Sequence, residues 1–213
     1  MTLINLEGLA LVGPGSEWFW SMLQFVIVAI TLYAIYRQVR LQASSSAIEQ
    51  VAALEHDWTA EAMTRSRLAV LNSLRDGVDS KSVPGQAGGS IGNFWDRVGY
   101  LVKAGHIQPQ LVWEYFSNTC ETWWAWLAPF AEETRRRFEV PQIFENFQWL
   151  AGQMAEMDRR AGQSVSFDEA YLARQLRPFI ESNVDALRTA EELRAVIVRP
   201  HSTALLKPEA TGP

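Results

Sequence analysis

Residues 18–36 read WFWSMLQFVIVAITLYAIY, a run of nineteen residues without a charged side chain. As an α-helix rising about 1.5 Å per residue, this run would be roughly 28 Å long, close to the ~30 Å hydrocarbon thickness of a bilayer. Aromatic residues stand at both ends, as in the belts that mark the two membrane interfaces; they are Trp18, Trp20, Tyr33 and Tyr36. The run therefore predicts a transmembrane helix over residues 17–36.

Two other interpretations compete with an anchor. A cleaved signal peptide begins with a positively charged region, whereas no Lys or Arg precedes Arg37. A buried helix of a soluble core is the second alternative, although a charge-free run of this length with aromatic ends is unusual for one. We therefore expect a membrane anchor.

Charges on either side of the run predict its orientation. Arg37 and Arg40 follow it, and Glu7 and Glu17 are the only charged residues before it. The positive-inside rule then predicts residues 1–16 as a short tail outside and the rest of the chain in the cytoplasm.

Composition restricts the kind of domain that the anchor can carry. The chain has 213 residues, of which 48% are hydrophobic and 20% charged, which suits one folded domain beside the anchor. Its net charge of −5 is a poor match to nucleic acid, so we expect no nucleic-acid partner. The single cysteine, Cys120, excludes an internal disulfide and a cysteine-based metal cluster.

Apolar residues recur at helical spacing and no segment alternates with a period of two, so the fold class predicted is all-α. The expected architecture is one N-terminal transmembrane helix that continues into a cytoplasmic helical bundle. Its predicted parts after the anchor are a juxtamembrane helix at 37–76, a flexible loop at 77–92, the bundle at 93–199 and a disordered tail at 200–213. A break of the juxtamembrane helix near Asp57–Glu61 is the alternative, because Asp57 or Thr59 could cap a new helix.

Local signals predict the helices of the bundle. Asn93 could cap the first helix, which ends at Gly105, and Pro109 begins a short second helix. A third helix is expected over residues 118–138, and Pro141 opens a fourth. Ser166 and Glu169 form a capping box that starts a last helix, bent at Pro178. The glycines of the 77–92 loop are not followed by a Lys-Ser/Thr pair, which argues against a phosphate-binding loop.

Three stretches resemble a family of bacterial proteins of unknown function. They are IYRQVRLQ at 35–42, WTAEAMTRSRLAVL at 58–71 and FWDRVGYLVKAGHIQPQLVWEYFSNTCETWWAWLAPF at 94–130. The resemblance extends from the anchor to about Arg160. It implies an N-terminal membrane helix with a helical cytoplasmic domain at the bacterial inner membrane, and it transfers no catalytic residues.

No group of residues predicts a chemical reaction. The three histidines are too scattered for a metal motif, and Cys120 is best interpreted as a buried structural residue. We therefore expect no catalytic, metal or cofactor site.

A surface for a partner is the site that the sequence indicates. Tryptophans and one basic run make up this candidate surface: Trp113, Trp126, Trp149, Arg135, Arg136 and Arg137. Trp126 points about 100° or more away from Trp123 and Trp124 on a helix, so at least one of the three is expected to be partly exposed. The basic run has two interpretations, a solvated face or a contact with anionic lipid headgroups.

The function expected from these features is that of a membrane-anchored accessory or interaction protein, a non-catalytic subunit or scaffold. Its expected partners are the lipid bilayer and either another protein or further copies of the chain. The alternative is a small-molecule sensor or effector with a ligand pocket in the helical domain, suggested by the tryptophans around Cys120 and His106.

Overall fold

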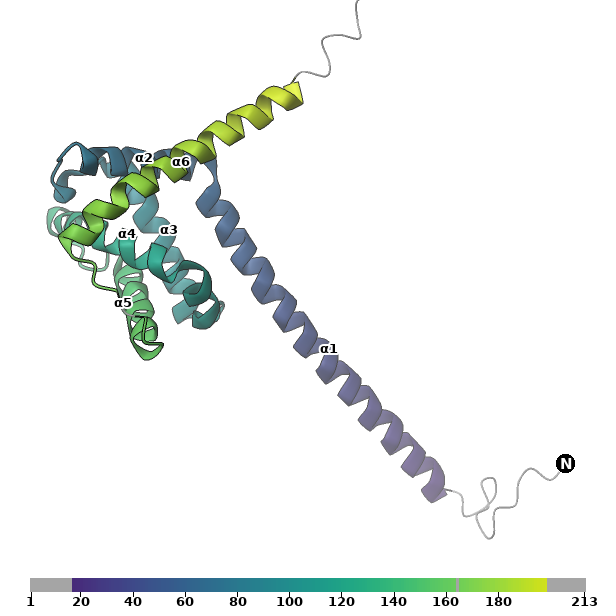
Figure 1. The fold of residues 1–213 in the computed structure, drawn as a ribbon. Helices are drawn as coiled ribbons and strands as arrows, with labels where there is room; N and C mark the ends of the chain where they lie inside the picture. The colour runs from purple at the N-terminus through teal and green to yellow at the C-terminus, as the bar shows by residue number, and fades with distance from the viewer. Residues whose placement is uncertain (1–16, 164, 199–213) are drawn as a thin grey trace, which may run out of the picture. The chain divides into compact units, whose positions relative to one another are not determined.

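The computed structural model describes residues 17–163 and 165–198, and every regular element in them is helical. The chain divides into two units, Met1–Glu49 and Gln50–Pro213. The elements in chain order are α1 Glu17–Thr59, α2 Glu61–Arg75, η1 Ser80–Ser82, α3 Gly85–Lys103, α4 Pro109–Phe138, α5 Glu145–Arg160 and α6 Glu169–Val198 (Figure 1). The all-α prediction is confirmed.

The first unit contains an apolar helical segment. The segment Glu17–Gln38 of α1 is long and apolar enough to cross a membrane, and none of its side chains is buried. The predicted aromatic ends are exposed, with Trp18 and Trp20 each 53% and Tyr33 67% accessible. Arg37 is also exposed, whereas the side chain of Arg40 and residues 1–16 and 199–213 lie outside the described part of the chain.

The second unit is a helical bundle with one core. Helix α3 packs against α2 and α5, α4 packs against α5 and η1, and α6 packs along α2 (Figure 1). The last turns of α1 contribute Val51, Leu54 and Trp58 to the core, and α2 contributes Val70 and Leu71. The bundle therefore begins near residue 50 rather than at the predicted residue 93.

The chain turns between α1 and α2 at Ala60, which has an extended backbone with φ −54° and ψ 140°. This is the break that was the alternative to one juxtamembrane helix. No side chain caps α2 at this residue. The side chain of Asp57 instead pairs with Arg97 of α3.

The predicted flexible loop at 77–92 is wrong in its second half, because α3 begins at Gly85. Two glycines of this stretch allow close packing of α3 against other side chains and do not mark a mobile loop. A Cβ atom at Gly88 would lie 3.0 Å from the Phe130 ring, and one at Gly92 would lie 2.6 Å from the Phe144 ring. Side chains at these positions would separate α3 from its neighbours.

Other helix boundaries also differ from the predictions. Residues 109–138 form one helix that includes Pro129, and α5 begins at Glu145 rather than at Pro141. Helix α6 begins at Glu169, where Asp168 rather than Ser166 accepts a hydrogen bond from a first-turn amide, that of Tyr171, at 2.7 Å. The predicted end of α3 is confirmed, since Gly105 follows it with φ +76°.

Helix α3 approaches the start of α5 closely at Gly99. A Cβ atom at this position would be 2.2 Å from the backbone carbonyl oxygen of Asn146, next to the start of α5. One turn earlier, the Asp96 carboxylate accepts hydrogen bonds from the amides of Asn146 at 2.8 Å and Phe147 at 3.1 Å. A side chain of α3 thus caps α5, which has no cap from its own N-cap residue, Phe144.

We predict that Gly99→Ala lowers the free energy of unfolding by about 1–3 kcal/mol, because the new methyl group must push α3 away from backbone atoms that cannot rotate aside. Gly89→Ala is the matched control in the same helix, because nothing lies within 4 Å of its added Cβ. This control should raise stability by about 0.5–1 kcal/mol through helix propensity. Chemical denaturation followed by circular dichroism measures both values; equal effects of the two substitutions would contradict the packing argument.

Candidate functional site

Tryptophan rings from three helices meet in the centre of the bundle. Trp95 and Trp123 are fully buried, and Trp58 lies against both, with ring centroids 5.0 Å and 6.0 Å away. Of Trp123, Trp124 and Trp126, the partly exposed residue is Trp124. Trp126, which was assigned to the partner surface, is 5% exposed, and its ring packs edge-on against Phe179 at 5.2 Å. Helix α6 covers the face of α4 on which Trp126 lies, and the sequence does not show this cover.

The other residues of the expected partner surface are scattered. Trp113 is half-buried and its indole N–H donates to Asp158. Trp149 is half-buried as well, with the Lys103 ammonium 5.8 Å from its ring centroid. Neither tryptophan offers a whole ring to a partner.

The three arginines of the basic run have different surroundings. Arg135 donates to the Ile143 carbonyl oxygen at 2.8 Å and to the Gln148 side chain at 2.9 Å, so it joins α4 to the start of α5. Arg136 is exposed and pairs with Glu133. Arg137 is exposed beside Phe138. The run therefore provides two exposed cations rather than three.

A buried arginine that the sequence analysis did not single out lies between α2 and α6. Arg67 is 7% exposed, and its guanidinium carbon is 4.4 Å from the centroid of the Trp58 ring. It donates to the Asn183 Oδ1 atom at 2.7 Å, to the Thr64 hydroxyl at 3.1 Å and to the Trp58 carbonyl oxygen. All three acceptors are neutral, and no acidic side chain in the described residues forms an ion pair with Arg67.

Burial lowers the pKa of the Arg67 guanidinium to about 10, so the side chain is cationic at neutral pH.

The sequence feature that could have indicated a buried Arg67 is its position on the helix. Arg67 stands three residues after the buried Thr64 and four before the buried Leu71, on the stripe of α2 that faces the core. A charged residue on a core-facing stripe needs a partner.

Arg67 lines a cavity of about 440 Å³. Aromatic side chains form one part of its wall: Trp58, Trp123 and Phe179. Small polar side chains form another: Thr59, Thr64, Thr119, Ser182 and Asn183. Among the described residues that line it, Arg67 is the only one with an ionisable side chain. Aromatic walls with a few polar groups are typical of small-molecule sites.

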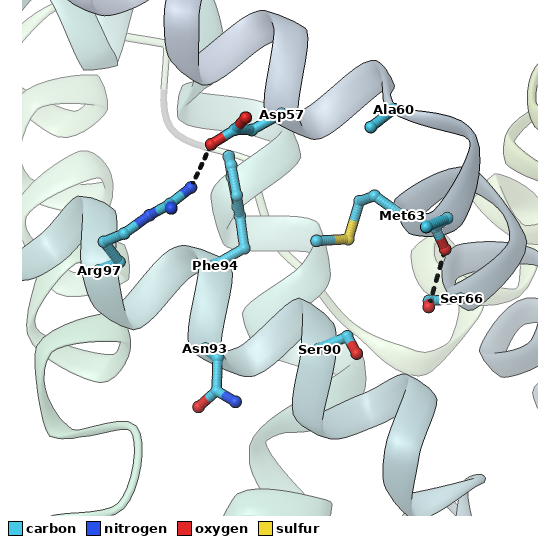
Figure 2. Close-up of a pocket in the computed structure, with 9 residues that line it drawn as sticks. Asp57, Ala60, Met63, Ser66, Ser90, Asn93, Phe94 and Arg97 are labelled. Carbon is cyan, nitrogen blue, oxygen red and sulfur yellow. Dashed lines mark hydrogen bonds and ion pairs between the residues drawn. The ribbon is translucent and has the colours of Figure 1, made fainter.

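A second cavity, of about 490 Å³, lies where the end of α1 meets α2 and α3 (Figure 2). Met63 and Phe94 supply its apolar wall. Arg97 lies at its edge, but this arginine already pairs with Asp57 at 2.6 Å, as the dashed line in Figure 2 shows. The charge at this cavity is therefore neutralised within the protein, unlike that of Arg67.

Two buried carboxyl groups form the other polar cluster of the bundle. Glu121 of α4 is 7% exposed and Asp158 of α5 is 8% exposed. Burial, with a hydrogen bond to and repulsion from Asp158, raises the pKa of Glu121 to about 8. Glu121 is therefore mostly protonated at neutral pH, and its hydroxyl group can donate a hydrogen bond to the Asp158 carboxylate.

Cys120 precedes Glu121 and is fully buried. Burial raises the pKa of its thiol, and the neighbouring Glu121 adds to the effect. A thiol that resists ionisation is a poor nucleophile, which agrees with its structural interpretation. In the part of the chain that the structure describes, no three His, Cys, Asp or Glu side chains form a group that could hold a metal ion.

We predict that the stability of the protein falls as the pH rises from about 4.5 to about 8, the two values between which Glu121 is protonated only in the folded state. One pKa unit corresponds to about 1.4 kcal/mol, so the loss is on the order of a few kcal/mol. Glu121→Gln keeps the shape and a donor while removing the titration. The melting temperature should depend less on pH across this range in the variant than in the wild type. Parallel pH profiles of the two proteins would contradict the assignment of this pH dependence to Glu121.

Comparison with known proteins agrees with the resemblance drawn from the sequence. Residues 21–154 match the family DUF4760, described as a domain of unknown function. The match begins in the apolar part of α1 and ends inside α5, so it leaves out α6. Neither the curated proteins nor the solved structures contain a match. Since the match covers more than half of the 213 residues, the chain belongs to the DUF4760 family.

Proposed function

We propose that this chain is a membrane-anchored accessory or interaction protein, a non-catalytic subunit or scaffold of the bacterial inner membrane. The observation that carries the proposal is the apolar segment Glu17–Gln38, whose large side chains have no protein cover. Phe25 is 73% exposed, Ile30 63% and Leu32 61%. A bilayer is the solvent in which such a helix is stable, because its backbone groups bond internally and its side chains contact lipid.

The family match supports the view that the apolar segment stays in the protein and is not cleaved off as a signal peptide. The match begins at residue 21, within the apolar segment, and α1 continues without interruption to Thr59. Cleavage after the apolar residues would remove part of the matched domain. An anchor thus fits better than a signal peptide.

Flanking charge supports an orientation with the N-terminus outside and the helical domain in the cytoplasm. Glu17 precedes the apolar residues and Arg37 follows them. Basic residues close to a membrane helix are retained on the cytoplasmic side.

We predict that a green fluorescent protein fused to the C-terminus is fluorescent in bacteria and sediments with membranes after carbonate washing. Replacing Arg37 and Arg40 by Glu should lower the fluorescence, because the positive flank that retains the domain inside is lost. The matched control replaces Arg136 and Arg137, which are far from the anchor in sequence. Fluorescence in the soluble fraction would refute the anchor, and an alkaline phosphatase fusion active at the same position would refute the orientation.

The accessory role is supported by aromatic side chains on the surface of the second unit. Tyr100 is 57% exposed, Tyr115 65% and Phe138 62%. Aromatic residues are enriched where proteins contact one another. These residues replace Trp126 as the candidates for contact with a protein partner or a second copy.

We predict that the full chain, purified from its native membrane in a mild detergent, elutes with a stoichiometric protein partner or as a homo-oligomer. Mass measurement of the particle and mass spectrometry of its components test this. The combined change Tyr100→Ser, Tyr115→Ser and Phe138→Ser should release the partner, whereas Leu193→Ser, at an exposed apolar residue of α6, is the control. A monomer with no companion would count against the accessory role.

The cavity at Arg67 favours a second function, that of a membrane-anchored sensor of a small molecule. A buried charge without a counterion has no evident role in a scaffold, whereas a binding protein can pair it with an anionic ligand.

A further inference from the structure

We propose that the cavity between α2, α4 and α6 binds a small organic anion, whose carboxylate or phosphate group pairs with Arg67 and whose apolar part lies against Trp58, Trp123 and Phe179. This inference deepens the second function, ligand binding by the helical domain, and does not depend on the anchor.

The charge of Arg67 is the first argument. A buried guanidinium is normally paired with a carboxylate, because removing a charge from water without a counterion is unfavourable. Arg67 is more than nine-tenths buried, and its three bonded partners are an amide, a hydroxyl and a carbonyl. The described part of the chain supplies no anion to this cation, so an anionic ligand would complete the site.

The second argument is the count of donors. A guanidinium has five N–H groups, and the three hydrogen bonds of Arg67 leave two of them for a ligand. Trp123 lines the same cavity, is fully buried, and its indole nitrogen has no hydrogen-bond partner among the described residues. Arginine and the indole N–H are donors only, so the missing partner must be an acceptor.

The residues that line the cavity indicate the chemistry and size of the rest of the ligand. Thr119 and Ser182 line the cavity, and their hydroxyl groups can donate to further acceptor atoms. The rings of Trp58, Trp123 and Phe179 favour a planar or aliphatic body. A volume of about 440 Å³ suits a metabolite-sized molecule rather than a peptide or a lipid.

Titration calorimetry of the full chain in lipid nanodiscs tests the proposal, with empty nanodiscs as the blank. The probes are phenyl phosphate and benzoate, and benzyl alcohol serves as the neutral match. We expect at least one anion to bind with a Kd below about 1 mM and the alcohol to bind at least about tenfold more weakly. Whichever anion binds more tightly identifies the head group.

Two variants test the role of Arg67. Arg67→Gln should abolish binding of the anion, whereas Arg97→Gln, at the other cavity, should leave it unchanged. Because Arg67 also joins α2 to α6, its loss could unfold the bundle. Ser182→Glu avoids this difficulty: it places a carboxylate in the same cavity, on the exposed side of α6, where it can pair with Arg67 in place of the ligand.

Ser182→Glu should weaken binding of the anion at least about tenfold without lowering the melting temperature, and Ser182→Gln, which removes the same hydroxyl group without adding a charge, should weaken binding less. Equal binding by the wild type and Ser182→Glu would overturn the proposal. So would tighter binding of the alcohol than of both anions, or the absence of any binding at millimolar concentrations. A soluble chain that still binds the anion would overturn the anchor and leave the site intact.

Discussion

The contact between α3 and the start of α5 is the constraint on which the arrangement of the bundle depends. At Gly99 the backbone of α3 comes so close to the Asn146 carbonyl that no side chain fits between them. This approach brings Asp96 within 2.8 Å of the Asn146 amide, where its carboxylate satisfies amides that α5 cannot satisfy itself. A carboxylate at the positive end of a helix dipole adds to the stabilisation. One turn of α3, which contains Asp96 and Gly99, thus both positions α5 and caps its N-terminus.

The aromatic core depends on this placement. With α5 held against α3, Phe147 stacks on Trp95 at 6.0 Å, and Trp95 in turn contacts Trp58 at the end of α1. Three indole groups leave little room for the N–H groups to find acceptors, and those of Trp95 and Trp123 have none among the described residues. Arg67 lies over the Trp58 ring, where the guanidinium gains a cation–π contact but no counterion. The cavity is therefore lined by two donors that lack a full complement of partners among the described residues, the Arg67 guanidinium without a counterion and the Trp123 indole without an acceptor.

Composition and spacing predicted those features that depend on neighbouring residues. The uncharged run before Arg37 predicted the apolar helix, and Gly105 predicted the end of α3, because each signal lies within the segment it describes. The glycines at 85–92 were misinterpreted as a loop. At Gly88 and Gly92 the weak helix propensity of glycine, about 1 kcal/mol per residue, is outweighed by close packing against Phe130 and Phe144, which come from distant parts of the chain.

Residues of the candidate site were missed for the same reason. Asn183, which bonds to Arg67, is 116 residues away in sequence, and the Asp96 cap of α5 spans 50 residues. The exposure of Trp126 could not be judged from the helical wheel of α4 alone, because the cover comes from Phe179 of α6. The one feature of the neighbouring sequence that indicated this site was the position of Arg67 on a core-facing stripe. This position predicts that the side chain is buried, but it does not identify the residue to which it bonds.

Helix α6 has a particular role in this architecture, because it completes the cavity although it lies outside the part of the chain that matches the family. Trp58, Arg67 and Trp123 belong to the matched part, whereas Phe179, Ser182 and Asn183 come from α6. The helix is fastened through Asn183 to Arg67, through Arg194 to Glu61, and through the Tyr171 hydroxyl to Asn118 at 3.1 Å. Two of these three links join exposed polar groups, which contribute little. An anion bonded both to Arg67 and to the hydroxyl groups of α4 and α6 would add a buried link at the same place. Ligand occupancy and the docking of α6 would then be thermodynamically linked, because a ligand that binds only the assembled cavity stabilises the assembled state.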